Sequence, residues 1–130
     1  MTTLELLLKR RSVLARNMVA PGPNREQLET ILMVGIRVPD HGKMAPWRAQ
    51  IIDSGGQAAL GELFAAIVGR ENPAVTAEQL IAERQRPSRA PVLLAISKTL
   101  QHDHKIQAME QRMSAGAFCQ NILVAAHAAG

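Results

Sequence analysis

The stretch Arg37-Val-Pro-Asp-His-Gly-Lys-Met-Ala-Pro-Trp-Arg48 links a predicted helix to a predicted strand, and the rest of the chain can be assigned around it. A plain connection of this kind needs only about 2–6 residues. This one holds two prolines and a glycine, which together leave the backbone few conformations. Its basic or titratable side chains are Arg37, His41, Lys43 and Arg48. Cations on a rigid loop suit an anionic, planar or polar ligand, although a rigid surface loop with solvated charges is an equally good interpretation.

The helix before this loop is predicted from capping and periodicity. Residues 24–27 form a capping box, and the apolar residues that follow recur at helical spacing as far as Ile36. Val38-Pro39 ends the helix, because the residue before a proline is pushed out of the α region, and Arg37 is therefore expected on the last turn. Gly35 costs a helix about 1 kcal/mol relative to alanine, so we expect it to permit the close approach of another element or a ligand.

The remaining elements follow in order. They are a short helix from Leu4 to about Lys9 behind a Thr2–Glu5 capping box, a strand at 47–53, a turn at 54–56, a helix at 57–69 with Leu60, Leu63, Phe64, Ile67 and Val68 inward, a capped helix from 76 to about 85, a strand at 91–97, and a helix from Ile106 or Met113 to Ala129. The strand at 91–97 is a continuous apolar run, which is typical of a strand buried on both faces. The last helix is apolar nearly all round, which predicts burial on several sides, and Gly130 suits the C′ position.

These elements include only two good strands. A two-stranded sheet is marginal by itself, and one of these strands needs cover on both faces. The sequence therefore predicts either that the chain is part of a longer fold or that a partner subunit supplies further strands.

Composition restricts the classes of function. The chain has 130 residues, 47% of them hydrophobic, and a formal net charge of +4, which favours anionic ligands. It has no Tyr, and aromatic residues make up 2%, so base stacking on aromatic side chains is a poor explanation of the charge and no nucleic-acid partner is expected. No apolar run is long enough to span a bilayer, so no membrane partner is expected. The apolar residues at the N-terminus precede the basic ones, which is the reverse of a secretory signal. The single Cys119 fits a reducing compartment, and a cytoplasmic location is therefore expected.

Two short polar motifs have competing interpretations. Arg10-Arg11-Ser12 follows the first helix, where cations are favoured by the helix dipole, but two guanidinium groups and a hydroxyl also match the oxygens of a phosphate. His102-Asp103-His104 invites a metal interpretation, but no third His or Cys is near in sequence, and we expect no metal site there.

Taken together, the motifs resemble the FMN-dependent nitroreductases, in particular their small bacterial NAD(P)H type. The matching segments are Leu4–Leu7 leading into Arg10-Arg11-Ser12, Gln27–Leu32 leading into Arg37–His41, Met44–Trp47, Arg89–Pro91, His104-Lys105 and Met113–Gly116. They occur in family order along the whole chain.

The resemblance implies an α+β fold, a mixed or antiparallel sheet surrounded by helices, in an intertwined homodimer with two FMN molecules at the interface. Arg10, Arg11 and Ser12 would hold the FMN phosphate and ribityl chain, and Arg37 and His41 would reach the flavin, at least one of them from the partner subunit. The helix end Ala125, Ala126, His127, Ala128, Ala129 and Gly130 would contact the nicotinamide dinucleotide. The implied activity is a ping-pong transfer of hydride from NAD(P)H through FMN to a nitroaromatic, a quinone or a similar acceptor, without a catalytic protein nucleophile.

The chain also departs from the pattern that it resembles. Family members continue past Gly130 with a further strand and a C-terminal arm, so residues 1–130 are expected to form a single nitroreductase-like domain that covers the N-terminal two thirds of the family fold. Residues 42–45 are less polar than in relatives. Alternatives are therefore a non-catalytic or truncated dimeric protein that binds flavin or a phosphate ligand, and a binding module for a phosphate-bearing ligand or RNA.

Overall fold

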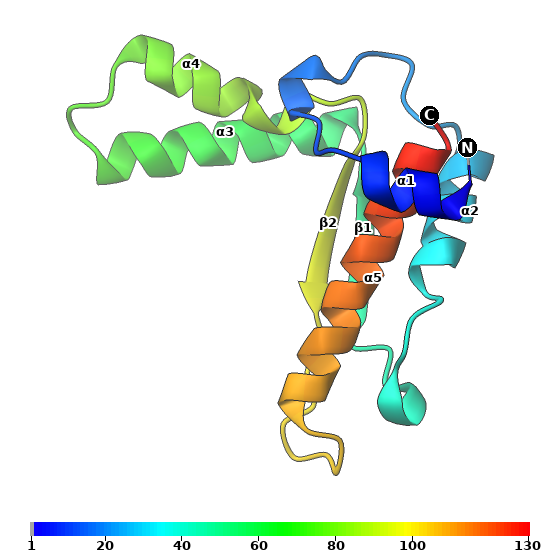
Figure 1. The fold of residues 1–130 in the computed structure, drawn as a ribbon. Helices are drawn as coiled ribbons and strands as arrows, with labels where there is room; N and C mark the ends of the chain where they lie inside the picture. Colours follow the sequence, from blue (N-terminus) through cyan, green and yellow to red (C-terminus); the bar gives the residue numbers. More distant parts are fainter. Residues whose placement is uncertain (1) are drawn as a thin grey trace. The chain divides into compact units, whose positions relative to one another are not determined.

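The computed structural model describes residues 2–130, which fall into two compact units (Figure 1). The first unit comprises the chain up to Ser12, Pro23–Ala49 and Ile96–Gly130, and the second comprises Val13–Gly22 and Gln50–Ala95. Every residue predicted to contact a cofactor lies in the first unit.

The first unit contains three helices, α1 (Thr3–Lys9), α2 (Arg25–Gly35) and α5 (Ala108–Ala128). The two capping boxes predicted at Thr2 and Asn24 are confirmed, since each side chain accepts from the backbone N–H three residues on. Both α1 and α2 pack against α5. The predicted C′ role of Gly130 is also confirmed, because Ala129 is the C-cap and Gly130 has a φ of 102°.

The core of this unit lies along one stripe of α5. Its buried residues recur at helical spacing and are Gln111, Ser114, Phe118, Ile122 and Ala125. The expected close approach at Gly35 is confirmed, because a Cβ built there would lie 2.9 Å from Ile122 Cγ1 and 3.0 Å from Phe118 Cε2. The ring of Phe118 also stacks on Trp47 at a centroid distance of 4.9 Å. One aromatic side chain thus packs against both ends of the loop that joins α2 to the first strand.

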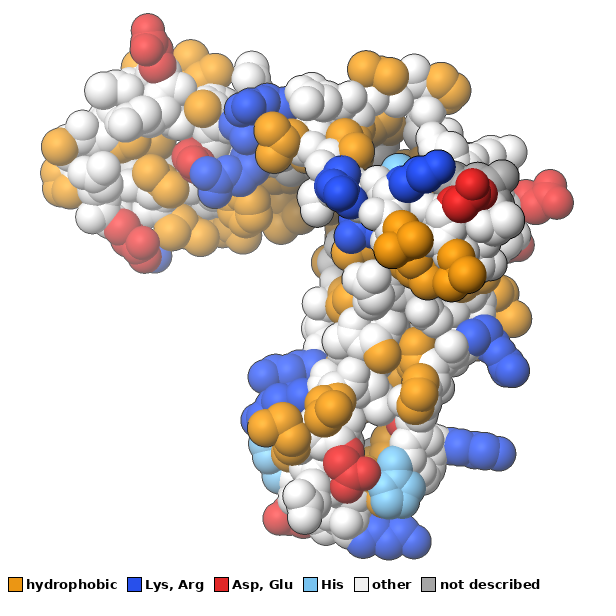
Figure 2. All heavy atoms as spheres, in the orientation of Figure 1, with side chains coloured by type: hydrophobic (Ala, Val, Ile, Leu, Met, Phe, Trp, Pro, Cys, Tyr) orange, Lys and Arg blue, Asp and Glu red, His pale blue; other side chains and the backbone are white. Residues whose placement is uncertain are grey.

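The prediction that α5 is covered on several sides is wrong for this chain. Met109, Met113 and Leu123 are 61%, 69% and 55% exposed, and they lie on the side of α5 opposite the buried stripe. On α1 only Leu6 is buried, and Leu4, Leu7 and Leu8 are exposed. Figure 2 shows apolar side chains over α1 beside a group of basic ones.

The second unit is built from α3 (Ser54–Glu71) and α4 (Ala77–Gln85), which pack against each other, with short 3-10 turns η1 (Ala15–Asn17) and η3 (Arg86–Ser88). The turn predicted at 54–56 is wrong. Asp53 accepts from the Gly56 N–H at 2.8 Å and caps a helix that already includes those residues. Leu63 was expected inward but is exposed, because α3 instead buries Gln57, Gly61 and Ala65. At Gly61 the backbone carbonyl of Arg84 occupies the place that a Cβ would take, so α3 and α4 could not approach this closely with any larger residue at that position.

The two predicted strands are present as β1 (Trp47–Ile52) and β2 (Leu93–Lys98), which pair antiparallel and form the one sheet found among residues 2–130. The predicted α+β class is confirmed. The prediction that the second strand is buried on both faces is wrong within this chain, since Ala95, Ser97 and Lys98 are exposed. Across residues 2–130 no helix combines the length and hydrophobicity needed to cross a membrane.

Candidate functional site

The predicted phosphate-binding residues lie at the C-terminal end of α1. Arg10 is the C-cap residue of this helix, and its N–H donates to the Leu6 carbonyl at 2.9 Å. Arg11 Nη1 donates to the Leu8 carbonyl at 3.2 Å and to the Arg10 carbonyl at 3.0 Å, so this guanidinium satisfies carbonyls that the helix end would leave without partners. Arg10 is half-buried, whereas Arg11 and Ser12 are exposed. Arg11 therefore caps the helix end, where the sequence predicted that the helix dipole would favour a cation. Its Nε and Nη2 groups have no hydrogen-bond partner within residues 2–130.

The second predicted group, Arg37 and His41, lies on the loop from Ile36 to Pro46. Helix α2, which precedes this loop, ends earlier than predicted: its last residue is Gly35 and Ile36 is the C-cap. Arg37 is therefore beyond the helix rather than on its last turn. Its carbonyl accepts from Asn121 Nδ2 at 3.0 Å, and its side chain is exposed.

His41 begins the 3-10 turn η2 (His41–Lys43) and is paired with the first turn of α5. Its Nδ1 lies 2.7 Å from Glu110 Oε2, with both side chains partly exposed. Gly42 follows with a φ of 74°, and a Cβ there would lie 3.1 Å from Ile106 Cγ1. Glycine is needed at this point because it adopts a left-handed conformation and brings the loop against Ile106.

The backbone after Gly42 remains unusual. Lys43 and Ala45 have φ values of 52° and 43°, which L residues with a Cβ adopt at a cost of about 1–2 kcal/mol. Asp40 Oδ2 accepts from the Ala45 N–H at 2.7 Å and offsets part of this cost. Pro46, at the end of the loop, is fully buried. A strained backbone held by long-range contacts is common at functional sites, and it makes this loop the best candidate in the unit.

Polar side chains of α5 support this loop and also the segment between β2 and α5, and neither role was predicted from the sequence. Ser114 Oγ donates to the Pro39 carbonyl at 2.9 Å, and Gln111, which is 1% exposed, bonds both the N–H and the carbonyl of Gln101. A signal was available in the sequence, because polar residues that interrupt one side of an otherwise apolar helix need partners when they are buried.

His41 and the predicted FMN-contacting residues at the end of α1 do not converge within one copy of the chain. His41 meets α5 at Glu110, in its first turn, whereas α1 packs beside the C-terminal half of α5 (Figure 1). With 21 residues at a rise of 1.5 Å, α5 is about 31 Å long, so His41 and α1 lie near opposite ends of one helix, whereas Arg37 is held between them at Asn121.

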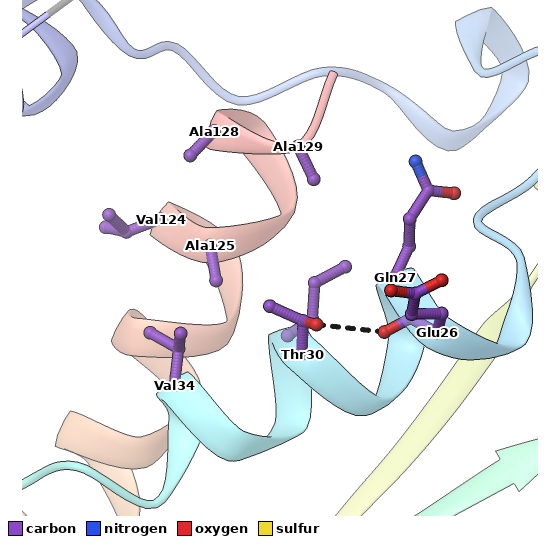
Figure 3. Close-up of a pocket in the computed structure, with 9 residues that line it drawn as sticks. Glu26, Gln27, Thr30, Val34, Val124, Ala125, Ala128 and Ala129 are labelled. Atoms are coloured by element: carbon purple, nitrogen blue, oxygen red, sulfur yellow. Dashed lines mark hydrogen bonds between the residues drawn. The ribbon is translucent and has the colours of Figure 1, made fainter.

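The predicted nicotinamide-contacting residues are only partly gathered in a groove. A groove of about 560 Å³ runs between α2 and the end of α5 (Figure 3). Its lining residues are Glu26, Gln27, Thr30, Ile31, Val34, Val124, Ala125, Ala128 and Ala129. Ala126, His127 and Gly130 are exposed and do not line it. The lining is mostly apolar, and the Thr30 hydroxyl is already bonded to the Glu26 carbonyl at 2.9 Å.

The His102-Asp103-His104 segment contributes to local structure. His104 Nδ1 accepts from the Ile106 N–H at 3.1 Å. Within residues 2–130 no group of three or more His, Cys, Asp or Glu side chains is arranged to hold a metal ion.

Sequence comparison shows which family and which proteins this chain is similar to. The model of the family described as "Nitroreductase family" matches residues 7–130. This chain belongs to the nitroreductase family. It is 36% identical over 132 aligned residues to "Putative NAD(P)H nitroreductase YdjA" of Escherichia coli K12, covering all of this chain and 69% of that protein. It is 31% identical over 131 residues to "Putative NAD(P)H nitroreductase" of Haemophilus influenzae, with the same coverage.

The fold agrees with that of a solved nitroreductase-like protein. A crystal structure of a nitroreductase-like family protein from Bacillus cereus superposes with a TM-score of 0.71 at 20% sequence identity. The match covers 97% of this chain and 64% of that one. The nitroreductase-like fold predicted from the sequence is confirmed, and the chain spans about two thirds of the length of the relatives that it matches.

Proposed function

We propose that this protein is an FMN-dependent oxidoreductase that takes reducing equivalents from NAD(P)H and passes them to nitroaromatic, quinone or similar acceptors. The observation that carries the proposal is the family match over residues 7–130, which contains both basic groups at the positions that the resemblance assigns to FMN. Because the match includes residues from both compact units, we also propose that they belong to one nitroreductase-like domain. A cytoplasmic location is part of the proposal, supported by the single Cys119.

The residues at the end of α1 fit the chemistry of FMN. Guanidinium groups and a hydroxyl are suitable donors for phosphate oxygens, and Arg10, Arg11 and Ser12 supply both kinds. Arg11 Nη1 donates to backbone carbonyls at the helix end, so the Nε and Nη2 groups of the guanidinium remain available to an anion.

The residues of the loop fit the other end of the cofactor. FMN, when bound, supplies the hydride chemistry, accepting from NAD(P)H and donating to the second substrate in a ping-pong cycle. The proposed task of the loop is to bind and orient the flavin. Because Asn121 anchors the backbone of Arg37, the guanidinium of Arg37 can stabilise negative charge nearby without reorganisation of the loop. No protein nucleophile is required. The groove that Ala125, Ala128 and Ala129 share with α2 is the proposed location of the nicotinamide dinucleotide.

A homodimer completes the proposal, with the two basic groups contributed by different copies. The separation of His41 from α1 along α5 supports this arrangement, because one copy alone leaves these two near opposite ends of the helix. The exposed Met109, Met113 and Leu123 give α5 a second apolar side that a partner can cover. Gly116 lies between them, and a Cβ there would meet no heavy atom within 4 Å, so packing inside the described chain does not account for this glycine.

The decisive experiment is the visible absorption spectrum of the purified protein, recorded before and after addition of FMN and gel filtration. We expect a retained flavin band that is bleached by NADH or NADPH. A dimer that takes up no FMN would overturn the oxidoreductase assignment for this polypeptide in favour of a non-catalytic dimeric protein. A retained band that neither nucleotide bleaches would support flavin binding and overturn NAD(P)H as the reductant.

A further inference from the structure

Three polar side chains lie along one side of α5, and each of them bonds the segment between α2 and β1. They are Glu110, Ser114 and Asn121, and with 3.6 residues per turn they project within about 40° of one another. Glu110 Oε2 lies 2.7 Å from His41 Nδ1, and Ser114 Oγ donates to the Pro39 carbonyl at 2.9 Å. We refer to these three residues as the loop-anchoring stripe.

The third member of the stripe holds two carbonyls at once. Asn121 Nδ2 donates to the Val34 carbonyl at 3.2 Å and to the Arg37 carbonyl at 3.0 Å. The first of these carbonyls belongs to the end of α2, and the second to the residue whose side chain is proposed to reach the flavin. Asn121 therefore fixes the direction in which the chain leaves the helix at Arg37.

We propose that the loop-anchoring stripe positions Arg37 and His41 for ligand binding, so that Glu110, Ser114 and Asn121 are positioning residues of the site. This inference rests on the proposed function and deepens it, because it names the groups that set the geometry of one half of the FMN site. The stripe acts on both predicted contacts by different means. Asn121 holds the backbone of Arg37, whereas Glu110 holds the ring of His41.

The contact at His41 has a specific chemical consequence. An ionised carboxylate only accepts hydrogen bonds, so Glu110 requires the proton on Nδ1 of the imidazole. The other ring nitrogen, Nε2, is then the atom presented to a ligand, and the ring orientation is fixed by its partner. The two side chains are 66% and 45% exposed, so the pair contributes little to stability and its value lies in orientation.

The structure also supplies a matched control. Gln120 is adjacent to Asn121 in sequence and carries a similar amide, but it is exposed and projects about 100° away around the helix. It lies on the side of α5 that holds Met113 and Gly116, so Gln120→Ala serves as a control at a protein concentration where gel filtration shows the same oligomeric state as the wild type. If the stripe merely contributed to helix stability, Gln120→Ala and Asn121→Ala would have similar effects on ligand binding.

The first test is spectroscopic and needs no flavin. In ¹⁵N-histidine-labelled protein, the His41 signals, identified by their loss in His41→Gln, should show a protonated Nδ1. The Glu110→Ala variant should lose this signature, and Glu110→Gln should retain it because the amide oxygen still accepts. A Glu110→Ala spectrum with an unchanged His41 ring would overturn the proposal.

The second test is the dissociation constant for FMN. One hydrogen bond to a charged carboxylate at Glu110, and two neutral hydrogen bonds at Asn121, support an expected weakening of about 10-fold for Glu110→Ala and for Asn121→Ala. The expected weakening is less than about 3-fold for Glu110→Gln and Gln120→Ala. The double variant Glu110→Ala/His41→Gln should bind no more weakly than His41→Gln, since the two residues act as a unit. Unchanged FMN affinity in Glu110→Ala and Asn121→Ala would overturn the positioning role and leave the proposed function standing. A wild-type protein that binds no FMN would overturn the proposed function instead, and the ring signature would still decide whether Glu110 positions His41.

Discussion

The two basic groups of the proposed flavin site are held in different ways. The loop from Ile36 to Pro46 is fixed by side chains about 70–90 positions away in sequence, from Glu110 to Asn121. The segment Arg10–Ser12 is fixed by its own helix, through bonds to Leu6, Leu8 and Arg10. The loop is therefore set in place by the tertiary fold before a ligand arrives, whereas the arginines at the end of α1 can adapt to one.

The largest expected effect comes from removing the residue on which the loop depends most. Phe118 packs against Gly35 at one end of the loop and stacks on Trp47 at the other. It is 2% exposed, so Phe118→Ala should lower the free energy of unfolding by about 3–5 kcal/mol. Denaturant unfolding measures this loss. In Met33→Ala, whose side chain is 62% exposed, the loss should stay below about 0.5 kcal/mol. Equal effects in the two variants would mean that the packing around Phe118 is not as described.

The next effect concerns binding at the adaptable group. Arg10→Ala should weaken FMN binding by about 10–100-fold, since a charge-assisted hydrogen bond contributes about 1.5–3 kcal/mol. The unfolding free energy should change little, because the Arg10 contact given by the structure is made by its backbone N–H. Arg25→Ala, which removes an arginine from an exposed pair with Glu29, is the control and should leave FMN affinity unchanged. Unaltered binding in Arg10→Ala would remove α1 from the site.

This difference between local and non-local support also explains what could be predicted from the sequence. The capping boxes at Thr2 and Asn24 and the C′ role of Gly130 were predictable because each depends on neighbouring residues and on backbone chemistry. The close approach at Gly35 was predictable because glycine is costly inside a helix, but its partners Phe118 and Ile122 were not. The end of α2 at Gly35 was not predicted, because Pro39 indicated that the helix would end later, at about Val38.

The anchoring of the loop was beyond the reach of local patterns. Neither the pair between His41 and Glu110 nor the bond from Asn121 to Arg37 follows from spacing along the chain. Burial was overestimated for a related reason. Apolar residues of β2 and α5 predict cover, but hydrophobicity does not say whether that cover comes from the same chain or from a partner.

A smaller effect is expected from comparing two glycines in the helices that support the loop. Gly35→Ala places a methyl group about 3 Å from Phe118 and Ile122, and should destabilise the protein by about 1–3 kcal/mol through overpacking. Gly116→Ala adds a methyl group where no heavy atom of the chain lies within 4 Å, and should stabilise the helix by about 0.5–1 kcal/mol. Thermal unfolding of dilute protein distinguishes the two. If Gly116→Ala instead lowers the melting temperature and weakens self-association, a partner lies closer to α5 at Gly116 than the single chain indicates.

The smallest expected effect separates the two roles of Arg11. As a cap, its guanidinium donates to the Leu8 and Arg10 carbonyls, and Arg11→Ala should lower the free energy of unfolding by about 0.3–1 kcal/mol. If Arg11 is also a phosphate ligand, the Arg11→Ala variant should in addition bind FMN more weakly. The Arg11→Lys variant keeps most of the charge at the helix end but lacks the two donor edges of the guanidinium, so it should lose FMN affinity with little loss of stability. Comparing unfolding and FMN titration for both variants separates the roles, because only the second depends on a donor edge that the helix does not use. If both variants lower stability but bind FMN as the wild type does, Arg11 belongs to α1 alone, and the adaptable half of the site reduces to Arg10 and Ser12.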